Sequence, residues 1–220
     1  MIATYILMAV IAYAIGSVNF SVILSKKIAG FDVREKGSGN AGTTNMLRSV
    51  GKGAAALTLL LDVLKGVIAI FIAKYVVGNI ASDANTAILV QLAGFFVVVG
   101  HTFPVFFGFK GGKGVATSLG VLLLVQPLIG GICLVFALVV MALTRMVSLG
   151  SIMAAILFPV LTIFITPDKY DYIASGYNYI FFGIAMAALV IFNHRSNLKR
   201  LYKGTENRLS FKYNKKLFIT

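Results

Sequence analysis

The sequence predicts an all-α fold, a polytopic membrane helix bundle of about seven transmembrane helices with its N-terminus outside and its C-terminus in the cytoplasm. Hydrophobic residues make up 59% of the 220-residue chain and charged residues 12%, against about 45–50% and 25% in soluble domains. The apolar residues form stretches that approach the roughly 20 residues needed to cross a bilayer as a helix. Most lysines and arginines gather at the ends of these stretches, as in membrane proteins.

Six apolar stretches supply the predicted helices in chain order. They cover residues 2–24, 54–77, 87–107, 115–143, 147–166 and 177–192. No cation precedes Lys26, so the first stretch lacks the positive start of a cleavable signal peptide, and we expect it to be retained. The fourth stretch would be about 43 Å long as one helix, and Gln126-Pro127 with the following glycines provides a break. We therefore predict two short, tilted helices there, which makes seven crossings.

The positions of the cations predict the orientation of the bundle. Cytoplasmic loops carry the excess of lysine and arginine, and residues 26–52 contain six of them. Seven crossings place every Lys and Arg on the cytoplasmic side except Lys65, Lys74 and Lys169, and leave Asp168 and Asp171 outside. Six crossings would put the basic segment 195–216 outside, against this rule.

Residues 1–206 are expected to form one transmembrane domain, and residues 207–220 a basic cytoplasmic tail. The tail interleaves cations with aromatic residues, so it either lies on an anionic leaflet or is a solvated terminus. A net charge of +13 would also suit nucleic acid, but nucleic-acid proteins present their cations on a soluble face. The lipid bilayer, and no nucleic acid, is therefore the expected partner. Cys133 is the only cysteine, so no disulfide is expected.

Residues 37–48, with the sequence GSGNAGTTNMLR, form the first of three polar stretches. Their hydroxyl and amide side chains stand near Arg48, and glycine lets the backbone approach an anion closely. The pattern predicts an anion-binding loop, and a loop whose glycines only turn the chain is the alternative. The Gly-x-Gly-x-x-Gly spacing does not indicate a dinucleotide site, because no hydrophobic strand precedes it.

The second polar stretch, residues 101–117, contains Lys110-Gly111-Gly112-Lys113-Gly114. The glycine amides would face the same anion as Lys113, at the start of a helix whose positive dipole end adds to the attraction. Anchoring on the positive side of the membrane would need the lysines but not the glycines. We therefore predict a second anion site, or the opposite wall of the first. A P-loop is excluded, because Gly114 stands where a serine or threonine is required.

His101 and His194 are the two histidines of the chain, and both are predicted at cytoplasmic ends of helices. They either support the fold or include at least one that contacts a substrate or a reacting proton. Without nearby carboxylates they make a poor metal site, so neither a metal nor a cofactor is expected. Asp62 and Lys65, at positions i and i+3 of the second apolar stretch, are costly in a membrane. They either neutralise each other or support the polar site.

Two further classes were weighed against the polar stretches. The chain has no Gly-x-Ser-x-Gly elbow and no histidine followed four residues later by aspartate, so no activated serine nucleophile is indicated. A transporter for a phosphorylated solute is the strongest rival, since basic sites between helices also serve transport. Paired broken helices in two halves are typical of many transporters, whereas this chain has one break, near Pro127.

The third polar stretch covers residues 193–200, with the sequence NHRSNLKR. Together the three polar stretches resemble the bacterial acyl-phosphate:glycerol-3-phosphate acyltransferase family. The resemblance rests on GSGNAGTTN with Arg48, on Gly100-His-x-Phe-Pro-Val-Phe with residues 109–117, and on His194-Arg195-x-Asn197 with residues 200–206. It extends from the first helix to Glu206 and implies that residues 1–206 are a single acyltransferase domain.

The resemblance also implies an activity. The enzyme would transfer a long-chain acyl group from acyl phosphate to the sn-1 hydroxyl of glycerol 3-phosphate, releasing lysophosphatidate and phosphate, as the first acylation of phospholipid biosynthesis. The site would lie on the cytoplasmic face of the bacterial inner membrane, and a peripheral enzyme that makes acyl phosphate would be a partner. The residues implied in catalysis are Ser38, Arg48, Lys113, His194 and Asn197. Those implied in substrate or phosphate binding are Asn40, Thr44, Asn45, His101, Lys110, Gly111, Gly112, Gly114, Arg195 and Glu206.

Overall fold

The structure, a computed structural model, describes residues 1–80, 84–165 and 177–209, without the side chains of residues 177 and 178. Every regular element within these ranges is helical, which confirms the predicted all-α class. The predicted outer residues Asp168, Lys169 and Asp171, and the tail from residue 210 onward, lie outside the described residues.

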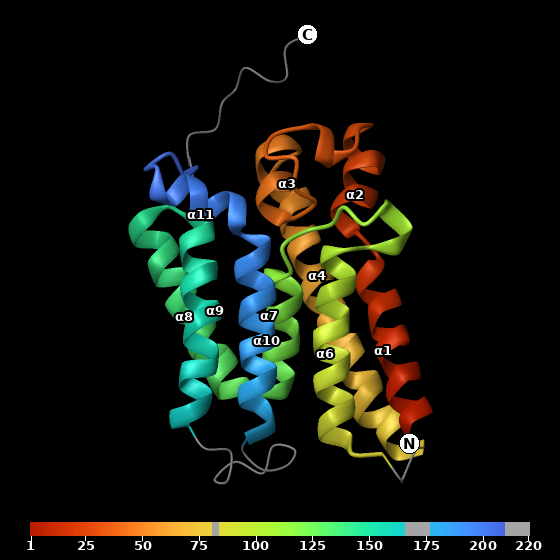
Figure 1. Cartoon of the computed structure of the whole chain (residues 1–220). Coiled ribbons are helices and arrows are strands. Elements are labelled where there is room, and N and C mark those ends of the chain that lie inside the picture. The colour runs from red at the N-terminus through yellow and green to blue at the C-terminus, as the bar shows by residue number, and fades with distance from the viewer. Residues whose placement is uncertain (81–83, 166–176, 210–220) are drawn as a thin grey trace.

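The described helices form an upright bundle with shorter elements at one end (Figure 1). The long helices are α1 Ile2–Ser17, α4 Lys52–Phe71, α6 Thr86–Thr102, α7 Val115–Val125, α8 Pro127–Thr144, α9 Val147–Phe164 and α10 Tyr177–Asn193. The shorter ones are α2 Phe20–Ala29, η1 Val33–Glu35, α3 Thr43–Ser49, η2 Ile72–Val77, α5 Gly78–Ile80, η3 Val105–Phe107 and α11 Arg195–Tyr202. The three polar stretches lie with α2, α3 and α11 at the end of the bundle opposite the N-terminus (Figure 1).

The structure shows where the fourth apolar stretch is divided and where the helix of the third stretch ends. The split of the fourth apolar stretch is confirmed: α7 ends before Gln126, and Pro127 is the first residue of α8, where a missing N–H costs nothing. The third stretch, predicted over residues 87–107, corresponds to the span-length segment Thr86–Phe107, within which the α-helix α6 ends at Thr102. Phe103 precedes Pro104, and the proline ring disfavours a helical conformation of the residue before it.

The first stretch, predicted over residues 2–24, lies within a segment long and apolar enough to cross a bilayer, Ile2–Ala29, but a short break interrupts the helix inside it. The chain leaves the helix at Val18 and Asn19, and α2 begins at Phe20. The Asn19 side chain caps α2 by accepting a hydrogen bond from the Val22 amide at 3.2 Å. Lys65 of α4 donates to the freed carbonyls of Gly16 and Val18, so the break is completed by a residue far away in the sequence.

Close helix contacts depend on glycine. A Cβ atom on Gly16 of α1 would stand 2.1 Å from the Val97 carbonyl oxygen of α6, and one on Gly120 of α7 would stand 2.1 Å from the Val63 carbonyl oxygen of α4. These distances are too short for any side chain, so only glycine permits the contacts. Small residues at such crossings are typical of membrane helices, which gain most of their association energy from packing.

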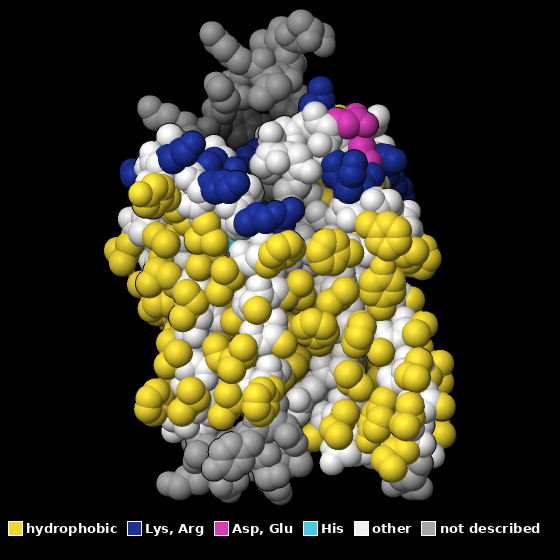
Figure 2. All heavy atoms as spheres, in the orientation of Figure 1, with side chains coloured by type: hydrophobic (Ala, Val, Ile, Leu, Met, Phe, Trp, Pro, Cys, Tyr) yellow, Lys and Arg dark blue, Asp and Glu magenta, His cyan; other side chains and the backbone are white. Residues whose placement is uncertain are grey.

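The surface is that of a membrane protein. Within the described ranges, five helical segments are long and apolar enough to cross a bilayer, or six when α10 and α11, bent by 64°, are taken as one. α7, with 11 residues, is about 16 Å long and shorter than a hydrocarbon core of about 30 Å, so the seventh crossing stays a prediction. Hydrophobic side chains cover the sides of the bundle and cations gather at one end (Figure 2).

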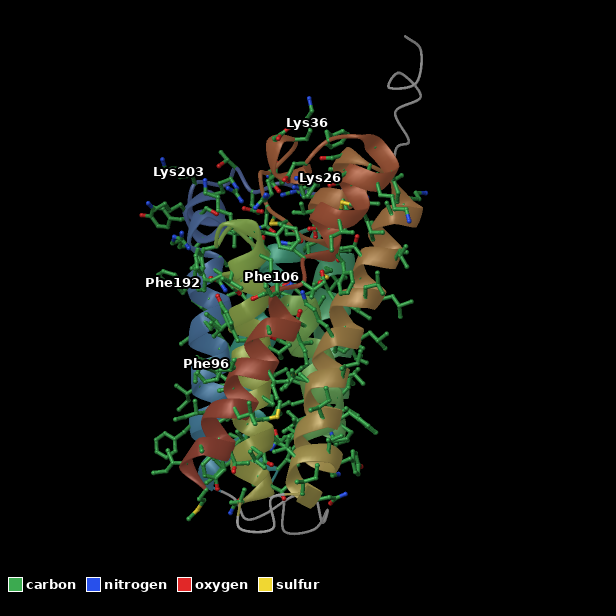
Figure 3. All side chains as sticks on the ribbon, turned by 90° about the vertical axis from the view of Figure 1, so that its right-hand side faces the viewer. Lys26, Lys36, Phe96, Phe106, Phe192 and Lys203 are labelled. Carbon is green, nitrogen blue, oxygen red and sulfur yellow. The ribbon has the colours of Figure 1, made fainter. Side chains whose placement is uncertain are left out.

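That end has a clear boundary. Lys26, Lys36 and Lys203 lie at the tip of the bundle, whereas Phe106 and Phe192 lie below them and Phe96 deeper still (Figure 3). Phe106 and Phe192 are exposed on the surface, as aromatic residues often are where a membrane meets water. The polar stretches therefore lie at a cationic edge of the apolar surface.

Candidate active site

A cavity of about 430 Å³ joins the polar end of the bundle to its apolar interior. Its polar wall comes from the loop before α3, the loop before α7, and α11 with the residues after it. Its apolar wall comes from α7, α8, α9 and α10, and reaches Leu122, Cys133, Phe158 and Met186. A ligand with an anionic head and a hydrocarbon tail matches this division.

Ten of the fifteen predicted site residues line this cavity. They are Ser38, Asn40, Thr44, Arg48, His101, Lys113, Gly114, His194, Asn197 and Glu206. They come from all three polar stretches, which the sequence separates by more than 50 residues. The other five, Asn45, Lys110, Gly111, Gly112 and Arg195, are not on the cavity wall.

Asn45 shapes the first stretch from behind. Its side-chain nitrogen donates to the carbonyls of Val33 at 2.8 Å and Lys36 at 3.0 Å, and its oxygen accepts from the Ser38 amide at 2.9 Å. The side chain is 1% exposed. Asn45 therefore fixes the loop that brings Ser38 to the cavity.

Arg34 joins the first stretch to the second. Its guanidinium pairs with Asp32 through Nε at 3.0 Å and Nη2 at 2.8 Å, and its Nη1 donates to the carbonyls of Phe107 and Lys110. The Arg34 hydrogen bonds hold the pKa of Asp32 at about 2. Lys110 is exposed and supplies its carbonyl to this contact.

Gly111 and Gly112 fold the second stretch back onto α6. Their amides donate to the carbonyls of Thr102 and His101, each at 3.1 Å. A Cβ atom on Gly111 would stand 2.0 Å from the His101 carbonyl oxygen, so no side chain fits there. This turn places the next residue, Lys113, on the cavity wall. Arg195 instead lies over the ring of Phe192, with 4.7 Å between its guanidinium carbon and the ring centre.

A chain of polar contacts connects the second stretch to the third. The Lys113 ammonium donates to Asn197 Oδ1, and Asn197 Nδ2 donates to Glu206 Oε1 at 2.8 Å. Glu206 also accepts from Arg200 Nε at 3.0 Å, and its carboxylate is 4% exposed. Arg48 is on the same wall, and no hydrogen bond or ion pair holds its side chain within the described part of the chain. Three cations thus surround one carboxylate, which leaves a surplus of positive charge for an anion.

Burial and neighbouring charges shift the pKa values of these groups. Burial, assisted by the positive charge of Arg200, lowers the pKa of Lys113 to about 8. Burial acts to raise the pKa of Glu206, but hydrogen bonds from Asn197 and Arg200 outweigh it and hold that pKa below its ordinary value. Glu206 is therefore ionised and Lys113 is charged at pH 7.

The activity should fall as the pH rises through about 8, because Lys113 loses its proton there. The value to measure is kcat/KM for the anionic substrate, which reports the free protein. In a Lys113→Arg variant the guanidinium keeps its charge, since the pKa of arginine exceeds 12. The variant should show no fall in this pH range; an equal fall in both proteins would contradict the assignment.

His194 stands at the bend between α10 and α11 and is 2% exposed. Its Nδ1 lies 2.8 Å from the Val190 carbonyl oxygen, which can only accept, so Nδ1 carries the hydrogen. Burial and the charge of Lys113 lower the pKa of His194 to about 4. At neutral pH the ring is therefore uncharged, and Nε2 is left as a hydrogen-bond acceptor.

The cavity wall includes residues that the sequence analysis did not assign to the site. The sequence could have assigned Arg200 to the site, because it follows His194 and Asn197 at intervals of three residues in a basic segment. No sequence pattern assigns Ser118, Ser148 and Ser151 to the site, since single serines in apolar helices are common. Asn207 and Leu209, beyond the predicted domain end, also line the cavity. No group of three metal-ligating side chains occurs in the described ranges.

Comparisons with known proteins identify one family across almost the whole chain. Residues 6–204 match the sequence profile of the family described as glycerol-3-phosphate acyltransferase. A protein of that name from Clostridioides difficile (strain 630) is 44% identical over 96% of this chain and 98% of its own length. One from Thermoanaerobacter pseudethanolicus is 46% identical over 94% and 96%.

Solved structures are similar as well. The crystal structure of PlsY, an integral membrane glycerol 3-phosphate acyltransferase, in its glycerol 3-phosphate form superposes with a TM-score of 0.79 at 38% identity, covering 94% of this chain and 96% of that one. The lysophosphatidic acid form of PlsY gives a TM-score of 0.76 at 36% identity, covering 94% and 95%.

Proposed function

This chain belongs to the glycerol-3-phosphate acyltransferase family and is a membrane acyltransferase, and from this premise we propose its donor, acceptor position and chemistry. The donor is a long-chain acyl phosphate, and the acceptor is the sn-1 hydroxyl of glycerol 3-phosphate. The products are lysophosphatidate and phosphate. The reaction is the first acylation of phospholipid biosynthesis.

One observation supports this proposal above the others: a single cavity holds a cationic cluster at one end and an apolar groove at the other. Acyl phosphate has a phosphate head and a hydrocarbon tail, so it would place its head among the cations and its tail between α7, α8, α9 and α10. Glycerol 3-phosphate has no tail and would occupy the polar end alone. The relatives' crystal forms carry glycerol 3-phosphate and lysophosphatidic acid, the acceptor and the product of such a reaction.

The cations suit two phosphates in one place. Arg48, Lys113 and Arg200 outnumber Glu206, the carboxylate they surround. Hydrogen bonds between charged partners are about twice as strong as neutral ones, and they strengthen further in a site partly shielded from water. Ser38 and Asn40 add neutral hydrogen-bonding groups to the cavity wall. We assign these residues to binding and orientation of the two phosphates.

The chemistry requires no acyl-enzyme. The sn-1 hydroxyl oxygen attacks the carbonyl carbon of acyl phosphate, the bond from that carbon to the phosphate oxygen breaks, and the hydroxyl proton leaves with the phosphate. Phosphate is a good leaving group, so positioning and charge stabilisation supply most of the rate. Lys113 and Arg48 stabilise the charge that develops on the departing phosphate and on the carbonyl oxygen.

The base is the donor's own phosphate in this proposal. His194, with a pKa of about 4, is a weak base at neutral pH, whereas the phosphate becomes more basic as its bond to the acyl carbon breaks. His194 Nε2 accepts a hydrogen bond from the attacking hydroxyl and orients it, and the proton then goes to phosphate. This division matches a buried, neutral imidazole whose Nδ1 is already bound to a carbonyl.

The proposed location of the protein determines how each substrate reaches the cavity. We place the protein in the bacterial inner membrane with the cationic end in the cytoplasm, as the positive-inside rule favours. Glycerol 3-phosphate then enters from the cytoplasm and the acyl donor from the membrane. Because acyl phosphate is a reactive anhydride, a peripheral enzyme that makes it at the membrane surface would serve as the partner.

A two-donor assay tests the proposal. Purified protein is given labelled glycerol 3-phosphate with palmitoyl phosphate in one tube and palmitoyl-CoA in another. We expect lysophosphatidate in the first tube only, acylated at the sn-1 position. Product in the second tube only would overturn the donor, and product acylated at sn-2 would overturn the position.

A further inference from the structure

Three ionisable side chains form a buried cluster between α4 and α6. Asp62, Lys65 and His101 have side chains that are 2%, 3% and 4% exposed. Lys65 Nζ lies 2.9 Å from Asp62 Oδ1, and His101 Nδ1 lies 3.4 Å from the same oxygen. Charges at this depth are costly in a membrane protein and are usually retained for a function. The mechanism above uses neither Asp62 nor Lys65.

Lys65 has a structural task that occupies it fully. Besides Asp62, it donates to the carbonyl of Gly16 at 3.0 Å and to that of Val18 at 2.8 Å. An ammonium group has three hydrogens, so these three contacts satisfy it. Lys65 thereby closes the break between α1 and α2, and Asp62 balances its charge.

His101 connects the cluster to the phosphate end of the cavity. A Cβ atom on Gly112 would stand 2.1 Å from His101 Nε2, so the imidazole lies directly against the Gly112 backbone. The carbonyl of His101 accepts the Gly112 amide at 3.1 Å. A rotation of the imidazole toward Gly112 would therefore push the turn that carries Lys113. His101 Nδ1 is buried without a well-formed hydrogen bond in the described part of the chain, and the carboxylate of Asp62, 3.4 Å away, is the side chain beside it that can fix the ring by electrostatic attraction.

We infer that Asp62 is a positioning residue: its carboxylate holds the imidazole of His101 against the Gly111-Gly112 turn and thereby sets Lys113 for the phosphate of glycerol 3-phosphate. The inference rests on the proposed acceptor. Simple neutralisation of Lys65 would not require Asp62 to line the cavity, nor to lie beside His101. Both features follow if Asp62 serves the turn as well as Lys65.

A pair of double variants separates positioning from charge balance. Asp62→Leu/Lys65→Met removes both buried charges with side chains of similar volume, and it also frees the carbonyls of Gly16 and Val18, a loss that both double variants share. Asp62→Asn/Lys65→Met differs from it only by keeping an acceptor for the imidazole. The measurements are the equilibrium Kd for labelled glycerol 3-phosphate without any acyl donor, and the melting temperature in detergent.

We expect the leucine variant to bind glycerol 3-phosphate at least tenfold more weakly than the unmodified protein, and the asparagine variant to recover most of that loss at a similar melting temperature. Equal, unmodified affinity in both variants would overturn the inference and leave Asp62 a counterion only. Equal loss in both would also overturn it, because the acceptor would then make no difference.

Two further measurements keep the test decisive. Ile70→Ala removes a buried side chain of the same helix that does not line the cavity. It should lower the melting temperature and leave the Kd unchanged, which calibrates any variant that loses stability. Backbone amide exchange over residues 102–115 should be faster in the leucine variant than in Ile70→Ala. Because the Kd needs no donor, failure of the donor assignment in the two-donor assay would be seen separately.

Discussion

Replacing Lys113 with alanine should lower kcat/KM for glycerol 3-phosphate by about 10- to 150-fold. The estimate is the loss of about 1.5–3 kcal/mol that accompanies removal of a hydrogen bond to a charged group, at about 1.4 kcal/mol for each factor of ten. Lys113 is the cation that the Gly111-Gly112 turn delivers to the cavity, and it also donates to Asn197. The initial rate of lysophosphatidate formation at varied glycerol 3-phosphate measures the loss.

Lys110→Ala is the matched control for Lys113→Ala. The two lysines are three residues apart in the same stretch, but Lys110 is exposed and away from the cavity, and the contact it makes with Arg34 uses its backbone carbonyl. A change of less than about threefold is expected, since surface substitutions away from such features change the energy by about 0.5 kcal/mol or less. Equal losses at both lysines would show that general positive charge matters, rather than the geometry of the turn.

Replacing Glu206 with alanine should have an effect of similar size for a different reason. Asn197 Nδ2 and Arg200 Nε would lose their common acceptor. Asn197 is buried, and a buried donor without a partner costs about 1–3 kcal/mol. Lys113, Arg200 and Arg48 would also repel one another without the carboxylate between them. We expect kcat/KM to fall by about 5- to 150-fold, with a lower melting temperature.

Glu35→Ala is the control for Glu206→Ala. Glu35 is an exposed carboxylate at the cationic end of the helix bundle, and it does not line the cavity. Its removal should leave kcat/KM and the melting temperature near those of the unmodified protein. The decisive observation is the ratio of the two losses. Comparable activity in the two variants would mean that the contacts from Asn197 to Arg200 do not organise the site.

The sequence predicted features whose cause lies in local chemistry or in the membrane. Pro127 breaks the fourth apolar stretch because its ring cannot continue a helix, and the structure has the break at that residue. The positive-inside rule predicted that the three polar stretches share one side, and residues of all three line one cavity in the structure. The family resemblance, carried by the residues of these stretches, is confirmed by the profile match.

Other features depend on partners that are far apart in the sequence. Asn19 caps α2 locally, but the break before it also depends on Lys65 of α4, which binds the freed carbonyls of Gly16 and Val18. The sequence predicts that Asn45 binds the substrate or its phosphate, but its side-chain amide donates to backbone carbonyls of the preceding loop. The sequence predicts that the amides of Gly111 and Gly112 donate hydrogen bonds to a phosphate, whereas in the structure they donate to carbonyls at the end of α6. In each case the tertiary contact decides between roles that the residue type leaves open.

The most direct test of the whole account is a single-turnover experiment, because the central claim is that one cavity holds both substrates and the acyl group passes straight between them. Excess protein is mixed with palmitoyl phosphate that carries the label in its acyl chain, with and without glycerol 3-phosphate. The reaction is stopped at a series of times. We predict that the label moves directly from palmitoyl phosphate to lysophosphatidate, and that no label remains on denatured protein at any time. Label bound to the protein that forms without glycerol 3-phosphate, and passes into lysophosphatidate when it is added, would contradict the account.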